Sequence, residues 1–334
     1  MDNNLPIKYP DIYFEPKYAN IYIRDNEKLK EYVYKSDIGL ITHLFIIRPI
    51  PFILKDKVQY YDIITPYGYG GPIIHNSTDK TKLIKGFIES FRKYVKENNI
   101  VSEFIRFHPL INNAIDFQDV YNSMYDRKTV GTNLTFDDVI STEFSKHKRK
   151  DIKKTLKNPD ISYKIEESPQ YLDDFLEVYY STMERDEADD YYFFDKNYFD
   201  NLLKTFPNNI VTCKVFFKDK IIAMGLYFKY SKYLHAHLSG SLTEYMEFSP
   251  AYILKYAMAN YGHDNGFEVI HYGGGTSSSP DNGLYKFKKD FGKNTEFDFY
   301  ISKKIWDNDI YNKLCETAKA DKNSSFFPAY RHNR

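Results

Sequence analysis

The order of apolar and polar positions in the first third of the chain is typical of an α/β unit. Two apolar runs, Leu40–Ile47 and Val58–Thr65, predict strands, and a Gly- and Pro-rich loop follows at 66–72. Residues Lys80–Asn98 carry apolar side chains at helical spacing, which predicts an amphipathic helix with one buried face. A further strand is predicted at Ser102–Phe107 and completes the unit.

The same order of elements recurs in the second half of the chain. Apolar runs predict strands at Ile210–Phe217, Ile221–Tyr230 and Tyr233–Leu238. The small residues Ser239–Ser241 are expected to form a loop. A helix should begin with Pro250 in its first position and stop at Gly266, because these residues favour those places. A strand over Phe267–His271 follows, so the pattern predicts a duplicated α/β unit.

Other helices lie between and after the two copies. The spacing predicts helices over Tyr171–Arg185 and Lys196–Thr205, a last strand over 297–301 and a final helix over Lys303–Lys319. Between the copies, seven of the twelve residues 146–157 are Lys or Arg. A basic helix of this kind is either a solvated face or a surface that binds phosphate groups.

Chain length and duplication together predict two domains. Domains of about 150 residues are common, so this chain has room for about two. We expect a first domain at 1–150 and a second at 151–302, with 303–334 packing back on the first. The halves are joined without a low-complexity linker, so we expect them to pack tightly.

Composition argues against several classes of protein. The 46 Lys and Arg balance the 46 Asp and Glu, so a protein that coats DNA through its net charge is not expected. Two cysteines, Cys213 and Cys315, rule out a disulfide scaffold and a zinc site built on neighbouring cysteines. The chain lacks an apolar run of about 18 residues and a signal-peptide pattern. We therefore expect a cytoplasmic protein, at most peripheral to a membrane.

Four motifs resemble those of the FemAB-like proteins. They are the loop TPYGYGGPI, the strand end EFIRFHP, the basic segment KRKDIKKTLKN and the C-terminal GGGTSSSPDNGLYKFKKDFG. FemAB-like proteins are double copies of the GNAT N-acyltransferase fold. The resemblance therefore implies an α/β (α+β) fold class with two GNAT-like domains in tandem, each a mixed sheet flanked by helices.

The resemblance also implies a reaction. FemAB-like enzymes transfer an acyl group to an amine. One branch moves amino acids from aminoacyl-tRNA to peptidoglycan precursors, and another acylates amino sugars of capsules and lipopolysaccharides. We expect a transferase that moves an acyl or aminoacyl group to an amine of a cell-envelope precursor, with a nucleotide- or lipid-linked sugar as acceptor. The sequence does not give the acyl group, the oligomeric state or whether both copies are functional.

Two residues are candidates for catalysis. Lys288, preceded by Phe287, falls at the family's Phe-Lys pair, where the lysine is thought to contact the reacting centre. An ammonium group there can neutralise a developing oxyanion. The alternative is a solvated lysine run, since further lysines lie beside it.

His108 ends a strand, and the ordinary pKa of histidine suits base catalysis. The alternative for His108 is a structural histidine bonded to the backbone.

The resemblance implies that substrate-binding residues lie in a cleft between the two copies. Arg106 can clamp a phosphate or carboxylate, and its alternative is an ordinary salt bridge. Arg149 leads the basic helix, and Tyr252, Phe287 and Tyr67 are further candidates. Stacking by Tyr191 and Tyr192 is a weaker candidate, because tyrosine is common throughout this chain. The cell-wall branch usually has Asp-Pro where this chain has His-Pro, which weakens the case for a peptidoglycan acceptor.

The acyl donor remains open between aminoacyl-tRNA, acyl-CoA and acyl carrier protein, with no tightly bound cofactor expected. Acetyl-CoA enzymes of the GNAT class hold the pyrophosphate with a Q/R-x-x-G-x-G/A loop before the long helix. The first copy has Gly68–Pro72 instead, where the proline lacks an N–H donor. The second copy has SGSLTEYMEFSP with one glycine. We expect CoA to bind weakly or not at all.

Two other functions stay open. One is a non-catalytic module that binds RNA or a nucleotide-linked sugar through residues 146–157. The other is an acetyl-CoA-dependent N-acetyltransferase with a non-standard loop. His235 and His237 are two residues apart and therefore share one face of a strand. Because a third ligand at convincing spacing is lacking, no metal site is expected.

Overall fold

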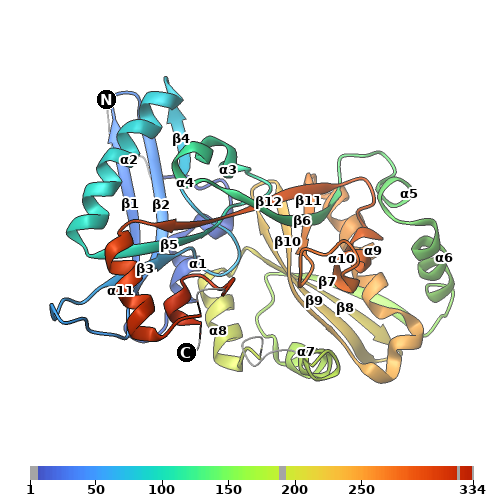
Figure 1. The fold of residues 1–334 in the computed structure, drawn as a ribbon. Helices are drawn as coiled ribbons and strands as arrows, with labels where there is room; N and C mark the ends of the chain where they lie inside the picture. The colour runs from blue at the N-terminus through green and yellow to red at the C-terminus, as the bar shows by residue number, and fades with distance from the viewer. Residues whose placement is uncertain (1–6, 188–192, 322–323, 333–334) are drawn as a thin grey trace. The chain divides into compact units, whose positions relative to one another are not determined.

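The computed structural model describes residues 7–187, 193–321 and 324–332 (Figure 1). The chain divides into two compact units. Unit 1 comprises Met1–Asp126 and Asp298–Arg334, and unit 2 comprises Arg127–Phe297. This division differs from the expected boundary at 150, because helices α5 (Val139–Glu143) and α6 (Lys146–Thr155) pack on a helix of unit 2. In the described residues, every helix is too short or too polar to cross a membrane.

Unit 1 is built on a mixed sheet. Its strands are β1 (Lys28–Ser36), β2 (Gly39–Pro49), β3 (Tyr61–Ile64), β4 (Ile73–Ser77), β5 (Ile100–Arg106) and the main part of β12 (Glu296–Ile305). They lie in the order β1-β2-β3-β5-β12, and β4 also pairs with β2. The β3–β5 pair is parallel, whereas the β2–β3 and β5–β12 pairs are antiparallel. The sequence analysis missed β1, whose residues are all half-buried or exposed and so give a weak apolar signal.

Helix α2 (Lys80–Glu97) covers this sheet and contacts β1, β2 and β5 (Figure 1). The predicted amphipathic helix is confirmed: its apolar stripe is buried, with Phe87 and Phe91 stacked at a centroid distance of 5.5 Å. The Asp79 side chain accepts a hydrogen bond from the Lys82 backbone N–H at 3.0 Å and caps the helix. The short helices of unit 1 are η1 (Ile12–Phe14), α1 (Pro16–Asn20), α3 (Asn113–Asp116) and α4 (Gln118–Tyr121).

The chain returns to unit 1 at its end. Residues 303–305, predicted to begin the last helix, continue β12 instead because the ladder with β5 extends to Ile305. Helix α11 (Asn308–Ala318) and the turn η4 (Ala329–Arg331) follow. Leu314 and Tyr330 join a buried cluster with Ile50, Phe52 and Val101.

The strands of unit 2 also combine parallel and antiparallel pairs. They are β6 (Met124–Asn133), β7 (Ile161–Glu167), β8 (Ile210–Phe217), β9 (Lys220–Tyr230), β10 (Tyr233–Ser241) and β11 (Val269–Gly274). The order is β6-β11-β10-β9-β8-β7, with β10 and β11 parallel and the other neighbouring pairs antiparallel. The predicted strands β8 and β9 are confirmed. Residues 239–241, predicted as a loop, extend β10 because they pair with β9.

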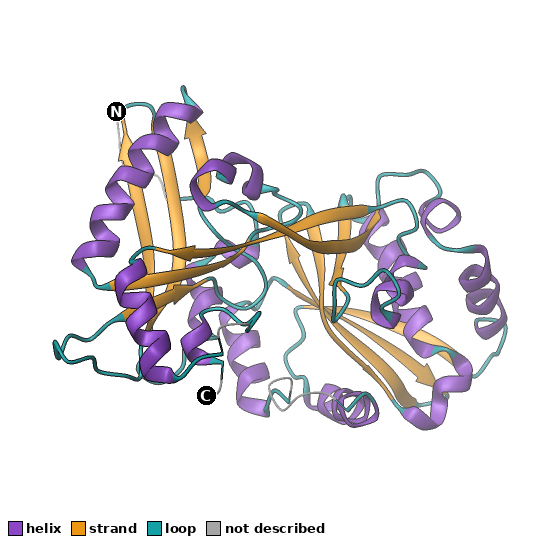
Figure 2. Cartoon of the chain, in the orientation of Figure 1, coloured by secondary structure: helices purple, strands orange, loops and turns teal. Residues whose placement is uncertain are grey.

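Helices cover both sides of the unit 2 sheet. Figure 2 shows its strands between α7 (Asp173–Arg185) and α9 (Pro250–Asp264). The 3₁₀ helix η3 (Thr243–Phe248) precedes α9, and α8 (Lys196–Thr205) and α10 (Gly283–Lys289) complete the unit. In both units, a helix lies between two neighbouring parallel strands in the chain: α2 between β3 and β5, and α9 between β10 and β11. The predicted duplication is therefore present in the topology.

Candidate active site

The ammonium group of Lys288 lies at the end of strand β11. The Asn282 side chain accepts a hydrogen bond from the Tyr285 backbone N–H at 3.1 Å and starts the short helix α10. This helix directs the Lys288 Nζ to the Gly274 carbonyl oxygen, to which it donates at 2.6 Å. The residue as a whole is half-buried, yet burial of its ammonium group lowers the pKa of Lys288 to about 8. The interpretation of Lys288 as part of a solvated lysine run does not fit this position.

The neighbouring lysines of α10 have different surroundings. Lys286 is exposed and pairs with Asp281 at 2.7 Å. Lys289 pairs with Glu296 at 2.7 Å. Both make ion pairs, whereas Lys288 is bonded to a backbone carbonyl.

A second buried lysine, Lys255 of α9, lies near Lys288. It is 9% exposed, and its Nζ lies 3.9 Å from the ring centroid of Tyr272. Burial, followed by the charge of Lys288, lowers the pKa of Lys255 to about 7. The sequence analysis missed Lys255. A usable signal existed, because Lys255 is the only charged residue between Pro250 and Gly262, in a helix that is otherwise apolar.

An irregularity in strand β11 positions the two groups that the lysines contact, the Tyr272 ring and the Gly274 carbonyl. The register of β11 against β6 shifts between His271 and Gly273, so Tyr272 is the extra residue of a β-bulge. Gly273 has a φ of 74°, a conformation that side chains other than glycine rarely adopt. Bulges of this type re-aim side chains, and this one brings the Tyr272 ring to Lys255 and the Gly274 carbonyl to Lys288.

Hydrogen bonds fix the Tyr272 ring. The Thr132 hydroxyl donates to the Phe291 carbonyl oxygen at 2.6 Å, so the Tyr272 hydroxyl, also at 2.6 Å, donates to Thr132. Burial raises the pKa of Tyr272 far above its usual value, so it stays protonated at physiological pH. The ring is therefore a rigid, neutral surface for Lys255.

Aromatic residues from α9 and α10 form a group next to Lys288. The rings of Tyr252 and Phe287 lie 6.1 Å apart, and Phe291 lies 5.6 Å from Tyr252. Lys148 of α6 donates to the Tyr252 hydroxyl at 2.7 Å and lies 3.6 Å from Asp290. Burial alone would lower the pKa of Lys148, but the bond to Tyr252 and the charges around it raise the pKa overall. Three predicted residues, Lys288, Phe287 and Tyr252, thus come together in unit 2.

Arg149, in contrast, points to a different partner. Its guanidinium donates to the Ser141 hydroxyl at 2.6 Å and to the Ser141 carbonyl at 3.2 Å. These bonds tie α6 to α5. The basic residue that reaches the aromatic group is its neighbour Lys148. The substrate-binding role predicted for Arg149 stays a prediction.

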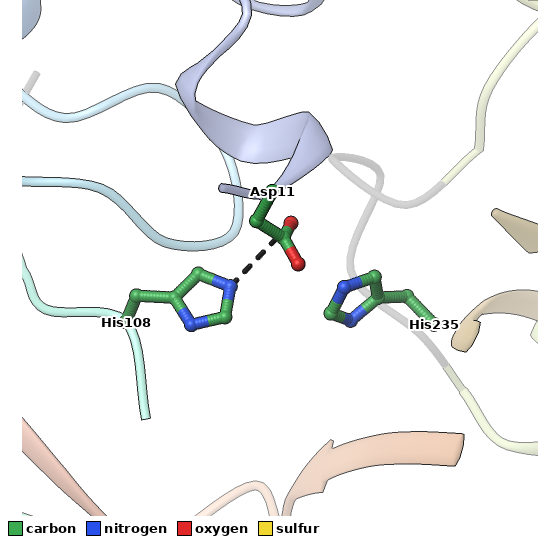
Figure 3. A group of neighbouring side chains, drawn as sticks. All are labelled: Asp11, His108 and His235. Atoms are coloured by element: carbon green, nitrogen blue, oxygen red, sulfur yellow. Dashed lines mark ion pairs between the residues drawn. The ribbon is translucent and has the colours of Figure 1, made fainter. Parts of the chain in front are cut away.

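In unit 1, His108 is fully buried at the end of β5. Its Nδ1 accepts a hydrogen bond from the Ile111 backbone N–H at 3.2 Å, and its Nε2 lies 3.5 Å from the Asp11 carboxylate (Figure 3). The acceptor role of Nδ1 places the proton of the neutral ring on Nε2, toward Asp11. This geometry favours the structural interpretation of His108, and its role as a base stays a prediction.

The other two predicted residues of unit 1 contact the Gly-rich loop and its surroundings. Arg106 donates to the carbonyl oxygens of Thr65 and Pro66 at 3.2 and 2.9 Å. Tyr67 stacks on Tyr22 with ring centroids 5.2 Å apart. Arg106 therefore contacts the loop through backbone carbonyls, and both its role in substrate binding and its alternative as a salt-bridge residue stay predictions. Whether these residues share a cleft with those of unit 2 stays a prediction.

The N-termini of the two crossover helices are poor sites for a pyrophosphate. In unit 1, the Asp79 carboxylate already caps α2, and its negative charge would repel a phosphate. In unit 2, α9 begins at Pro250, which lacks an N–H. The N–H groups of Ser249 and Tyr252 are bonded to the carbonyls of Met246 and Ser249 at 2.9 Å each. Both observations agree with weak CoA binding, which no comparison tests.

The strand histidines have partners within unit 2. His237 shares a hydrogen bond of 2.6 Å with the Tyr198 hydroxyl, and burial together with the neighbouring His235 lowers the pKa of His237 to about 3. His271 shares a bond of 2.9 Å with the Thr129 hydroxyl. Tyr191 and Tyr192 lie outside the described residues.

Residues 143–289 match the model of the acetyltransferase (GNAT) domain. The crystal structure of FemX aligns with a TM-score of 0.68 at 15% identity, over 91% of this chain and 94% of that one. The chain has the FemAB-like tandem GNAT fold. The expected fold class is thus confirmed, and residues 143–289 match a domain of the acetyltransferase class.

Two further structures resemble this chain. The C-terminal domain of a putative lysylphosphatidylglycerol synthetase from Agrobacterium fabrum has a TM-score of 0.54 at 12% identity, over 82% of this chain and 84% of that one. A tandem GNAT protein from the clavulanic acid biosynthesis pathway has a TM-score of 0.50 at 9% identity, over 84% and 85%. A comparison of the sequence with curated proteins gave no match.

Proposed function

We propose that the protein transfers an acyl or aminoacyl group from an activated donor to an amine of a cell-envelope precursor. The observation that carries this proposal is the buried ammonium group of Lys288, bonded to the Gly274 carbonyl at the end of β11. It lies in a domain of the acyltransferase class, beside the aromatic group of Tyr252 and Phe287. Buried, preorganised cations of this kind suit a reaction in which negative charge develops.

The chemistry assigns Lys288 the role of oxyanion donor. An amine that attacks an ester or thioester forms a tetrahedral intermediate with a negative oxygen. Because its pKa is about 8, Lys288 is mostly charged at neutral pH and can donate to that oxygen. Its bond to Gly274 holds the ammonium in place before the reaction, so little reorganisation is needed.

An aminoacyl-tRNA is the donor we favour over acyl-CoA. The capped N-terminus of α2 and the proline at the start of α9 offer a pyrophosphate few N–H donors. One similar structure is the C-terminal domain of a putative lysylphosphatidylglycerol synthetase, a name that describes a lipid carrying an amino acid. The acceptor we favour is a nucleotide- or lipid-linked amino sugar or a peptidoglycan-type intermediate.

A direct transfer assay tests the proposal. Purified protein is incubated with a mixed pool of aminoacyl-tRNAs and with UDP-linked amino sugars, and products are detected by mass spectrometry. We expect an acceptor whose mass rises by one aminoacyl residue. The same mixture without protein is the control for uncatalysed transfer, and Lys288→Met should give much less product than wild type. Absence of acylated product with aminoacyl-tRNA, acyl-CoA and acyl carrier donors alike would contradict the proposed function.

A second candidate function is RNA binding without catalysis. Helix α6 exposes Lys146, Lys150, Lys153 and Lys154, which gives a basic surface suited to phosphates. Binding of this kind weakens steeply as the salt concentration rises. Salt-sensitive tRNA binding together with a wild-type protein that is inactive in the transfer assay would favour this function.

A further inference from the structure

The burial of Lys255 is unexplained by packing alone. In a fully apolar helix, a lysine at this position costs stability unless its charge has a partner. Within the described ranges, the Lys255 ammonium makes no hydrogen bond and no ion pair. Its Nζ lies instead over the face of the Tyr272 ring. The neighbouring Lys288 repels it. A methionine of similar size would fill the same space without this cost, so the amine itself has a use.

The two lysines differ in what their nitrogen atoms can do. Lys288 is fixed as a donor by the Gly274 carbonyl, which favours its charged form. Lys255 faces the centre of the Tyr272 ring at 3.9 Å. A neutral amine can direct an N–H to that ring, which leaves its lone pair on the side away from the ring. Lys255 is therefore the one of the pair that can accept a proton.

Surrounding charges support this division of roles. The elements packed against α9 carry other titratable side chains, among them Glu143 on α5, Lys148 on α6, Tyr163 on β7, Cys213 on β8, Tyr227 on β9, His235 on β10, and His271 and Tyr272 on β11. Of the charged groups, Lys288 is the one that acts on Lys255, and together with burial it brings the pKa of Lys255 to about 7. Buried ionisable groups with strongly shifted pKa values are typical of active sites.

We propose that Lys255 is the general base of the transfer reaction and that Lys288 is its oxyanion donor. This inference rests on the proposed function. It assigns to Lys255 the proton of the attacking amine, which the charged Lys288 cannot accept. As the amine nitrogen bonds to the acyl carbon, the neutral Nζ of Lys255 removes one proton from that nitrogen. The tetrahedral intermediate then collapses, and the bond between the acyl carbon and the donor's ester oxygen breaks. The Lys255 ammonium gives its proton to this oxygen, which leaves as a hydroxyl group. The amide, the free hydroxyl of the donor and neutral Lys255 are the products.

A pH profile of the variant reactions tests the role of Lys255. The donor is an aminoacyl-tRNA and the acceptor is a UDP-linked amino sugar, and kcat/KM is measured from pH 5.5 to 9. In wild type the rate should rise as pH passes about 7, where Lys255 loses its proton, and fall above about pH 8, where Lys288 loses its charge. Lys255→Met should lower kcat by about 10²–10⁴-fold and lose this rise. Lys286→Met, which removes an exposed lysine of α10, should keep the wild-type profile.

Chemical rescue separates a base from a packing residue. In Lys255→Ala, added methylamine or ethylamine should restore part of the lost rate, with a rate that depends on the pKa of the amine. A residue that only fills space would give no such dependence. Wild-type turnover by Lys255→Met, or a lost rate that no amine restores, would overturn the inference while leaving the proposed function in place.

A readout that needs no substrate tests the same assignment. With ¹³C-labelled lysine, the side-chain signal of Lys255 is identified by its loss in Lys255→Met, and its titration is followed by NMR. We expect a midpoint near pH 7, well below that of the exposed lysines. A Lys255 signal that stays charged up to about pH 10 would overturn its role as a base. A wild-type protein inactive with every donor would instead remove the proposed function itself, and the inference with it.

Discussion

Helices α2 and α9 occupy equivalent places in the two units, yet their surroundings differ. Helix α2 buries one apolar stripe on its sheet and turns its other residues to solvent, as the lysines and glutamates of its sequence require. Helix α9 is covered by the sheet on one side and by α5 and α6 on the other. It therefore buries residues around most of its circumference, Lys255 among them.

The difference in burial between α2 and α9 indicates which copy of the duplicated fold holds the reactive groups. A helix with one exposed side keeps its charged groups in water, where their pKa values stay ordinary. A helix covered on both sides removes water from any ionisable group that it carries, so the pKa shifts and the group becomes reactive near neutral pH. On this comparison, α2 stabilises unit 1 and α9 helps to form the active site of unit 2. The following experiments test each half of this statement.

The largest effect is expected from the core beneath α2. Phe91 is fully buried and its ring lies 5.5 Å from Phe87 and 5.7 Å from Trp306. Phe91→Ala should lower the free energy of unfolding by about 3–5 kcal/mol, because it removes apolar contacts and leaves a cavity. Urea denaturation measures this loss. If α2 is only structural, the variant that remains folded should keep its KM, and a raised KM would contradict the comparison.

The next effect concerns Lys288 of unit 2. Lys288→Met should lower kcat by about 10²–10³-fold, equivalent to about 2.7–4 kcal/mol, with KM nearly unchanged, because the oxyanion exists only in the transition state. Steady-state kinetics with the substrates of the transfer assay measure it. Lys286→Met is the matched control, since its partner Asp281 is exposed and outside the aromatic group. Equal losses in both variants would show that any lysine of α10 has this effect.

A smaller effect should appear in the pH dependence of stability. The pKa of Lys255 falls from 10.5, its ordinary value, to about 7 in the folded protein. Between these values the unfolded chain binds the extra proton, so folding stability gains as pH rises and is lost as pH falls toward 7. The contribution is at most about 1.4 kcal/mol per pH unit. Denaturation of wild type and Lys255→Met at pH 7, 8 and 9 should show that the variant's advantage shrinks as pH rises. A constant difference would mean that Lys255 is charged throughout.

The smallest effect is expected from acetyl-CoA. Asp79 occupies the N-terminus of α2 with a negative charge, and Pro250 removes one N–H donor from the start of α9, so both ends are poor sites for a pyrophosphate. Calorimetry with acetyl-CoA should give little or no heat of binding. A micromolar affinity for acetyl-CoA would contradict this expectation and favour the acetyl-CoA-dependent N-acetyltransferase.

The sequence predicted the elements with a strong local signal. The α2 stripe, strand β8 and the start of α9 at Pro250 each depend on neighbouring residues, so their patterns were sufficient. Strand β1 was missed because its exposed and half-buried residues alternate without an apolar run. The boundary near 150 was displaced because packing of α5 and α6 on α9 is a tertiary contact.

The site shows the same limit. Lys288 was identified through the family motif, whereas the spacing of residues gave no reason to separate it from the other lysines of α10. The partner of His108 is Asp11, far away in the sequence, and no periodicity indicates such a pair. Lys255 was missed because the apolar face of α9 dominates its pattern, and a single lysine does not change the periodicity that predicts the helix. A lone ionisable residue inside an otherwise apolar helix is a signal that sequence analysis can use.

The return of the chain to unit 1 also sets an order of events during synthesis. Residues 127–297 form unit 2 from one continuous segment, so it can fold as soon as that segment has left the ribosome. Unit 1 must wait for β12 and α11, which supply the neighbour of β5 and the Leu314 side chain of its core. Until then β5 is an open edge that can pair with other chains. Residues made after unit 2 thus cover the open edge of the part of unit 1 that is made before it.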